Sequence, residues 1–209
     1  MEGVLEKDER RFETLYSKAL HPYVVYTPAV ALLSYFAVDS FIDWLRWTLI
    51  TLALLYFFSS GYVYLRMRSM KTPDGKRIHS REFFRRRIGE MIVPSFLFIA
   101  PAALGLYLLN GPVSLLALVI AVGGAMLIVV LVNFFYRASL HLSSTTGIMT
   151  ALGLTVGWIF AAVLPIVLLL GFARYRLGEH TIPQMIVGSA IGIGCAFAVF
   201  YALGVYAFS

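Results

Sequence analysis

The sequence predicts an all-α fold, a polytopic transmembrane helix bundle, on three observations. Hydrophobic residues make up 60% of the 209 residues and charged residues only 13%, about half the share of a soluble domain. The mean hydropathy is +0.82. The apolar residues also fall in long runs between short polar segments. Because a soluble fold of this size cannot bury so many apolar side chains, soluble enzymes, disordered chains and secreted disulfide scaffolds are excluded.

Residues 1–20 predict an N-terminal interfacial helix, amphipathic and lying on the membrane surface. Acidic and basic side chains are mixed there with apolar ones, and Leu5, Phe12 and Leu15 fall on one side. The segment lacks the basic start, apolar centre and small-residue cleavage site of a signal peptide. The membrane-embedded bundle is therefore expected to occupy residues 21–209.

Apolar runs in residues 21–209 predict about seven helices. The longest run, residues 142–172, has about 31 residues, whereas about 20 cross the hydrocarbon core. Gly157 and Pro165 interrupt this run, so we divide it into two short helices between Gly157 and Trp158. If the run were a single helix, the bundle would have six helices. The other expected runs are residues 23–38, 44–65, 91–109, 113–136 and 181–208.

The charges predict which end of the bundle faces the cytoplasm. A chain with seven spans has four charged segments on one side of the membrane: the N-terminus, a basic loop at residues 66–90, Arg137 and the segment 174–179. Arg46 is the only Lys or Arg that falls on the other side. Cytoplasmic segments are enriched in Lys and Arg. We therefore expect an integral, multi-pass membrane protein with this face in the cytoplasm. The opposite orientation stays open, because a face that binds phosphate is basic on either side.

Two polar clusters beside the apolar runs are the candidate functional site, because ionisable residues near membrane depth are costly and usually functional. Two helices separate the clusters along the chain, so both fall at the same end of a seven-helix bundle. The first cluster contains Arg137, Ser139 and His141, and the second contains Arg174, Glu179, His180 and Gln184.

These residue types are typical of phosphate chemistry. Arginine offers a planar, permanently charged fork to phosphate oxygens, and two histidines can serve as nucleophile and proton donor. His180, at the start of a helix, would also have free backbone N–H groups nearby. Carboxylates are few in these segments, so neither a metal nor another cofactor is expected. The alternatives are histidines that bond between helices and arginines that anchor headgroups, above all the run Arg85, Arg86 and Arg87.

The order and spacing of these residues resemble the type 2 phosphatidic acid phosphatase (PAP2) superfamily, over roughly residues 66–192. Ser139-Leu140-His141 is similar to its Ser-Gly-His element. A second stretch is similar to its Ser-Arg-x5-His-x3-Asp element: five residues separate Arg174 from His180, and three separate His180 from Gln184. This chain departs from the pattern in having Leu140 for the glycine, Ala173 for the serine and Gln184 for the aspartate.

The resemblance implies a divergent lipid phosphatase that works without metal through a phosphohistidine intermediate. It implies that His180 attacks phosphorus and that His141 protonates the leaving oxygen and then activates water. The implied substrate is a phosphate monoester or diphosphate of a membrane lipid, such as phosphatidate, phosphatidylglycerophosphate or an isoprenyl diphosphate. The lipid bilayer is the expected partner and nucleic acid is not. The phosphate-binding candidates are Arg174, Ser139, Arg137 and, for the family's first element, Arg85, Arg86 and Arg87.

Gln184 leaves two other functions open, a non-catalytic protein that binds or transports lipid phosphate and a lipid phosphotransferase. At positions i and i+4 of one helix, His180 and Gln184 would share a face, and the amide oxygen would accept a proton from the imidazole. An amide cannot supply the negative charge that stabilises an imidazolium, and it can also flip. We expect the histidine to be oriented by this amide and activity to be retained.

Overall fold

The computed structural model describes residues 22–69, 92–157 and 159–205. The expected interfacial helix at residues 1–20 and most of the basic loop lie outside these ranges. In the described residues, all regular secondary structure is helical. The helices are α2 (Pro22–Ala37), α3 (Phe41–Ser69), α5 (Ile92–Leu108), α6 (Val113–Val132), α7 (Leu140–Val156), α8 (Ile159–Arg176) and α9 (Ile182–Ala202).

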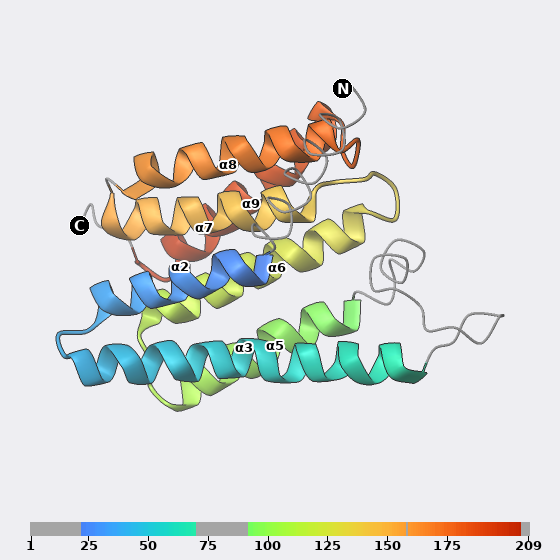
Figure 1. The fold of residues 1–209 in the computed structure, drawn as a ribbon. Helices are drawn as coiled ribbons and strands as arrows, with labels where there is room; N and C mark the ends of the chain where they lie inside the picture. The colour runs from blue at the N-terminus through green and yellow to red at the C-terminus, as the bar shows by residue number, and fades with distance from the viewer. Residues whose placement is uncertain (1–21, 70–91, 158, 206–209) are drawn as a thin grey trace, which may run out of the picture.

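Successive described helices run in opposite directions, side by side in one bundle (Figure 1). One end of the bundle is therefore where α2, α5, α7 and α9 begin and where α3, α6 and α8 end. We name it the basic end. Arg137, Arg174 and Arg176 lie in or beside the turns at this end. Arg46 lies near the opposite end, where its guanidinium pairs with Asp43 at 2.9 Å.

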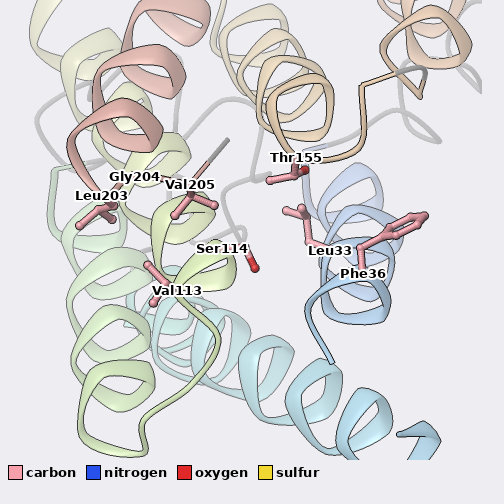
Figure 2. Close-up of a pocket in the computed structure, with 8 residues that line it drawn as sticks. All are labelled: Leu33, Phe36, Val113, Ser114, Thr155, Leu203, Gly204 and Val205. Carbon is pink, nitrogen blue, oxygen red and sulfur yellow. The ribbon is translucent and has the colours of Figure 1, made fainter. Parts of the chain in front are cut away.

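A pocket of about 460 Å³ opens at the end opposite the basic end, where α2, α7 and α9 finish and α6 begins (Figure 2). The Ser114 hydroxyl points into it. The described residues that line this pocket are apolar or carry a hydroxyl, and none is charged. They are Leu33, Phe36, Val113, Ser114, Thr155, Leu203, Gly204 and Val205.

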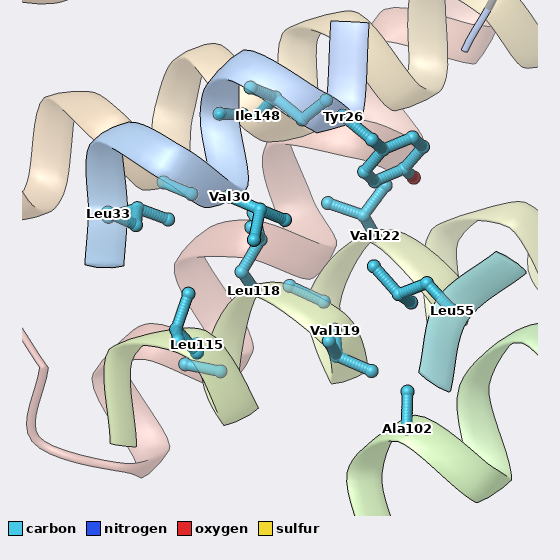
Figure 3. Packing of buried hydrophobic residues seen from close by; sticks show 14 of the residues in the cluster. Tyr26, Val30, Leu33, Leu55, Ala102, Leu115, Leu118, Val119, Val122 and Ile148 are labelled. Carbon is cyan, nitrogen blue, oxygen red and sulfur yellow. The ribbon is translucent and has the colours of Figure 1, made fainter. Parts of the chain in front are cut away.

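The main apolar core joins α2, α3, α5, α6, α7 and α9 (Figure 3). Val30, Val122 and Ile148 come from three of these helices and are almost completely buried. At one edge the rings of Tyr26 and Phe98 meet edge to face, with their centroids 5.3 Å apart. This core fixes how α6 and α7 lie against the first three described helices.

α7 is the central helix, since every residue from Leu142 to Leu152 is buried. It packs against α2, α6 and α8, and most extensively against α9. Most of its hydroxyl side chains bond to carbonyl groups of the preceding turn: Thr145 Oγ1 donates to His141 O at 2.7 Å and Thr150 Oγ1 to Thr146 O at 2.8 Å. This local bonding allows a helix rich in Ser and Thr to lie in an apolar interior.

Glycines allow α7 and α9 to approach each other closely. A Cβ atom built on Gly192 would lie 2.0 Å from the carbonyl oxygen of Ser143, which real structures do not tolerate. Thr146 Oγ1 also lies 3.2 Å from the carbonyl oxygen of Ser189 on α9 and donates to it. Small residues are typical of close helix packing in membranes.

The outside of the bundle carries many large apolar side chains. A monomeric soluble protein rarely exposes wide apolar patches, whereas a bilayer covers them. Within the described ranges, three helical segments are long and apolar enough to cross a membrane: Phe41–Tyr62 of α3, Val113–Val132 and Ile182–Ala202. Exposed examples are Phe57, Phe96, Leu104, Leu168, Phe172, Phe197 and Tyr201.

The predicted division of the longest apolar run is confirmed. α7 ends at Val156, and Gly157 follows with φ +71°, a left-handed conformation that glycine adopts without strain. Our expectation that Pro165 would interrupt the run is wrong, because this proline lies inside α8 and the helix continues past it. Membrane-type helices tolerate such prolines because neighbouring groups satisfy the freed carbonyl.

Several other boundaries differ from the prediction. α6 ends at Val132 instead of residue 136, and α8 continues to Arg176 instead of ending at residue 172. α3 continues to Ser69, so residues 66–69 are helical and do not belong to the expected basic loop. No glycine or proline stops the helix before the Thr72-Pro73 turn signal. α9 ends at Ala202 instead of reaching residue 208, because Gly204 turns the chain with φ +68°.

Candidate functional site

The two predicted clusters lie at the same end of the bundle. The turn from α6 to α7 carries the first cluster and the turn from α8 to α9 carries the second, and both turns are at the basic end (Figure 1). Arg85, Arg86 and Arg87 lie outside the described residues. The candidate site is therefore built from these two turns and the helix ends beside them.

Backbone hydrogen bonds define the turn after α8. The N–H of Glu179 donates to the carbonyl of Arg174 at 3.1 Å, and the N–H of Gly178 donates to the carbonyl of Tyr175 at 3.0 Å. Gly178 has φ +63°. This pair of bonds around a left-handed glycine is a Schellman motif, which satisfies the last carbonyls of a helix. It folds Glu179 back over the last turn of α8.

Arg174 is buried, with 6% of its surface exposed, and its guanidinium forms an ion pair with the Glu179 carboxylate. A buried arginine requires such a partner, because an uncompensated charge in an apolar interior is very costly. The sequence predicted Arg174 as a phosphate ligand but did not predict this pair. The two residues are five positions apart, a spacing that brings side chains together only where a helix ends in a tight turn.

His180 precedes α9, and our assignment of His180 and Gln184 to one helical face is wrong. Thr181 is the N-cap, with an extended backbone, so the helix begins only at Ile182. Gln184 is the third helical residue, and its Oε1 accepts a hydrogen bond from the backbone N–H of Thr181 at 3.1 Å. The same oxygen lies 3.4 Å from Nδ1 of His180. The predicted contact between imidazole and amide is present, with a different geometry.

The Thr181 N–H also fixes which way the Gln184 amide points. A backbone N–H can bond only to the amide oxygen, since the amide nitrogen is itself a donor. The oxygen is therefore held toward both Thr181 and His180, and rotation of the amide would lose the capping bond. In this geometry His180 donates from Nδ1, which leaves Nε2 with its lone pair.

His180 lies in the turn outside the helices, in an electropositive and partly buried environment. Burial lowers the pKa of His180 below its usual 6.5; its hydrogen bond with Gln184 acts in the opposite direction, and the charges of Arg174 and Arg137 lower the pKa further. The ring is consequently neutral at pH 7. A neutral imidazole beside guanidinium groups is the form that a histidine nucleophile requires.

Ser139 is the N-cap of α7 and is completely buried. Its Oγ accepts from the N–H of Leu142 at 3.5 Å, so the hydroxyl has a structural role as a helix cap. The preceding turn is tied by Asn133, whose Oδ1 accepts from the N–H of Ala138 at 2.6 Å. We did not single out Asn133 from the sequence, although an Asn between two helices is a usual turn residue.

His141 lies in the first turn of α7 and is partly buried. Its Nε2 atom is shielded from solvent. The hydroxyl groups of Ser144 and Thr145 donate to its backbone carbonyl at 3.0 and 2.7 Å. The hydroxyl residues that follow the Ser-x-His element thus stabilise the start of α7 and do not form a second set of phosphate ligands.

A direct backbone contact joins the two clusters. The N–H of Ser139 donates to the carbonyl of Gln184 at 3.1 Å, and α9 packs so closely here that a Cβ on Gly188 would lie 2.5 Å from the carbonyl oxygen of Ser139. The start of α7 is therefore fixed against the first turn of α9. Arg137, which is exposed, lies close enough for its charge to act on His180.

Among the described residues, neither the pocket of Figure 2 nor any group of metal ligands lies at the candidate site. The pocket of Figure 2 is at the opposite end of the bundle and includes no residue of the candidate site. Among the described residues, no three His, Cys, Asp or Glu side chains gather as metal ligands. Comparison of the chain with protein-family models, curated proteins and solved structures finds no match.

Proposed function

We propose that the chain is a multi-pass membrane protein whose seven described helices all cross the bilayer, with the basic end at the cytoplasmic headgroups. The alternating directions of the helices support this topology. α2, α5, α7 and α8 have 16 to 18 residues, fewer than the ~20 of an isolated span. A central helix such as α7 need not span the full thickness, because protein surrounds it.

We propose further that the candidate site is that of a lipid phosphatase of the PAP2 type. The observation that carries this proposal is the environment of His180: a neutral imidazole held by Gln184, with the charges of Arg174 and Arg137 acting on it. The N-terminal end of α9 adds its partial positive charge. Together these groups favour a phosphoryl group facing His180.

The proposed reaction has two steps. Nε2 of His180 attacks phosphorus, the bond from phosphorus to the lipid oxygen breaks, and protonated His141 gives its proton to that oxygen. Neutral His141 then takes a proton from water, the water oxygen attacks phosphorus, and the bond from nitrogen to phosphorus breaks. The products are the dephosphorylated lipid and inorganic phosphate. Arg174, and Ser139 through its hydroxyl proton, stabilise the charge on the equatorial oxygens.

The substrate class follows from the place of the site. A phosphate-binding site at the end of a helix bundle lies at headgroup depth. Such a site suits an amphiphile whose phosphate reaches the site while its tails stay in the bilayer. Phosphatidate, phosphatidylglycerophosphate and isoprenyl diphosphates all present such a group. With the basic end in the cytoplasm, a biosynthetic dephosphorylation fits better than recycling of a carrier lipid on the outer face.

A second candidate, a lipid-phosphate binding or transport protein, is favoured by the existing partners of the site residues. Gln184 caps α9, Ser139 caps α7 and Glu179 occupies Arg174. Each residue therefore has a structural role that does not require turnover. A phosphotransferase would use the same first step, with an alcohol in place of water.

Release of phosphate by purified protein in mixed micelles tests the proposal. We expect the wild type to hydrolyse at least one of the three substrates, and His180→Gln and Arg174→Gln to lose at least about 10²-fold in rate. Arg46→Gln, a charge-matched change at the opposite end, should keep full activity. Saturable lipid binding without turnover would favour the binding protein, and a phosphorylated acceptor without free phosphate would favour the phosphotransferase.

A further inference from the structure

The two arginines of the candidate site lie at different depths. Arg174 is buried, with its side chain only 8% exposed, and it is paired with Glu179. Arg137 is exposed and forms no ion pair within the described ranges. The inner positive charge thus has a counterion in the protein, whereas the outer one has none. Arg137 is therefore where the site offers an unbalanced positive charge to a ligand.

The backbone on one side of Arg137 is fixed against the helix that His180 precedes. The next residue, Ala138, is almost completely buried. Ser139 follows, and its N–H donates to the carbonyl of Gln184 at 3.1 Å. The side chain of Gln184 in turn contacts His180. The turn that carries Arg137 is thus attached to the first turn of α9, and in agreement with this placement the charge of Arg137 lowers the pKa of His180.

We propose that Arg137 is a specificity-determining residue that binds a second phosphoryl group of the substrate, placed between the reacting phosphoryl group and the tails. This inference rests on the proposed function. The reacting group enters the partly buried space beside His180, while the tails stay in the bilayer, so the rest of the headgroup passes the exposed rim of the site. Arg137 lies at this rim, and a guanidinium presents a planar fork to phosphate oxygens.

Two kinds of lipid carry a second phosphoryl group in that position. In an isoprenyl diphosphate it is bonded directly to the reacting group, and in phosphatidylglycerophosphate a glycerol unit lies between the two. Phosphatidate and an isoprenyl monophosphate have no second phosphoryl group. The chemistry that the two sources share is an additional anionic phosphate on the tail side of the reacting phosphorus.

With a diphosphate, the contact would also act on the leaving group. Nε2 of His180 attacks the terminal phosphorus, and the bond from that phosphorus to the bridging oxygen breaks. The bridging oxygen keeps the electron pair and leaves as part of the lipid monophosphate. Water then attacks the phosphohistidine and releases inorganic phosphate. Arg137 would stabilise the negative charge that develops on the departing monophosphate.

This contact distinguishes substrates, unlike the contacts of the inner residues. Every phosphate substrate meets His180, Arg174 and Glu179 through its reacting group, so the contributions of these three residues are common to all substrates. The effect of Arg137 on the pKa of His180 is also common to all of them. Only a second phosphoryl group gains the direct contact with Arg137. Specificity is a difference of two affinities, and this contact does not cancel from it.

Arg137→Gln tests the inference. We would measure kcat/KM from initial rates in mixed micelles for two pairs of substrates with matched chains: isoprenyl diphosphate against isoprenyl monophosphate, and phosphatidylglycerophosphate against phosphatidate. The variant changes the environment of His180 for all four substrates, and that change cancels from the ratio within each pair. The ratio should fall about tenfold in at least one pair, the size expected for a lost charge-assisted hydrogen bond. The pair that responds identifies the source of the second phosphoryl group.

Two further variants act as controls. Arg176→Gln removes another exposed positive charge at the basic end, so it measures how far the whole basic face attracts the more highly charged substrate. Both ratios should stay unchanged in this variant. Arg137→Lys keeps the charge but not the planar fork, and it should lose less of the preference than Arg137→Gln.

Unchanged ratios in Arg137→Gln, or an equal fall in Arg176→Gln, would overturn the inference. If the wild type still hydrolyses phosphatidate or the isoprenyl monophosphate, the proposed function stands and only the inference fails. A wild type that hydrolyses none of the four substrates removes both.

Discussion

At the residue scale, the chemistry of the candidate site depends on the charge of one imidazole. His180 is partly buried and faces the charges of two arginines, which together keep the ring neutral near pH 7. The same lowered pKa has a consequence for stability. As the pH falls below 6.5, the unfolded chain takes up a proton at this position more readily than the folded protein, so this group makes folding less favourable in acid.

Arg137→Gln tests this electrostatic description. Removal of a positive charge that lowers the pKa of His180 should raise that pKa toward 6.5, so the ring becomes protonated at a higher pH. NMR titration of the His180 ring protons measures the change directly, and the acidic limb of the pH profile of the proposed phosphatase activity should move to higher pH in parallel. Arg46→Gln should leave the titration as it is; a His180 titration unaffected by Arg137→Gln would contradict the description.

The positions of these residues could be predicted from the sequence better than their contacts. Arg174, His180 and Gln184 were identified by type and spacing, and they do lie together. The sequence also held a signal for the actual geometry: Thr181-Ile182-Pro183-Gln184 matches the Thr-x-x-Gln pattern of a capping box, with proline early in the helix. We gave more weight to helical i, i+4 spacing, and so placed His180 inside the helix instead of before it.

At the scale of elements, the two helix ends that form the site are stabilised locally. Gly178 ends α8 and Gln184 caps α9, with only five residues between the two helices. The start of α7 is then fixed to this unit by the bond from Ser139 to Gln184. The apolar runs predicted the existence of the seven described helices, but they carry no information on this bond, because it joins two backbone groups 45 residues apart.

Gly192→Ala tests the close packing of α7 on α9. A Cβ at this position would collide with the backbone oxygen of Ser143, so the helices must separate. Overpacking of this kind typically costs about 1–3 kcal/mol, and we expect thermal unfolding in detergent at a clearly lower temperature. Gly194→Ala, two residues further along α9, is the control, since a Cβ there meets nothing within 4 Å. Equal stability of the two variants would be evidence against the packing.

At the scale of the whole molecule, the alternating directions of the helices place the candidate site and the pocket at opposite ends of the bundle. Most charged residues of the described chain lie at the basic end. The opposite end holds Asp39, Asp43 and Arg46, and the pocket of Figure 2 with its apolar and hydroxyl lining. The composition predicted a helical membrane protein, and three of the described helices are long and apolar enough to cross a bilayer. The proposed topology adds the four shorter described helices, α2, α5, α7 and α8, to these three.

Cysteine labelling in sealed vesicles measures that topology. In a Cys195→Ala background, single cysteines at Asp39 and Arg176 place a thiol at opposite ends of the bundle, and both positions are exposed. If the helices cross the bilayer, a membrane-impermeant maleimide should label one position before detergent is added and the other only afterwards. With the basic end in the cytoplasm, Arg176→Cys should react in inside-out vesicles. Labelling of both positions from one side would contradict a seven-span chain.

The contact between Ser139 and Gln184 also sets an order of events during synthesis. Gln184 belongs to the last helix of the described chain, and its carbonyl group is what the turn before α7 bonds to. A ribosome-bound nascent chain that has inserted only the helices up to α8 therefore has both histidines but no organised site. The proposed activity should appear in a single late step, after α9 has packed against α7.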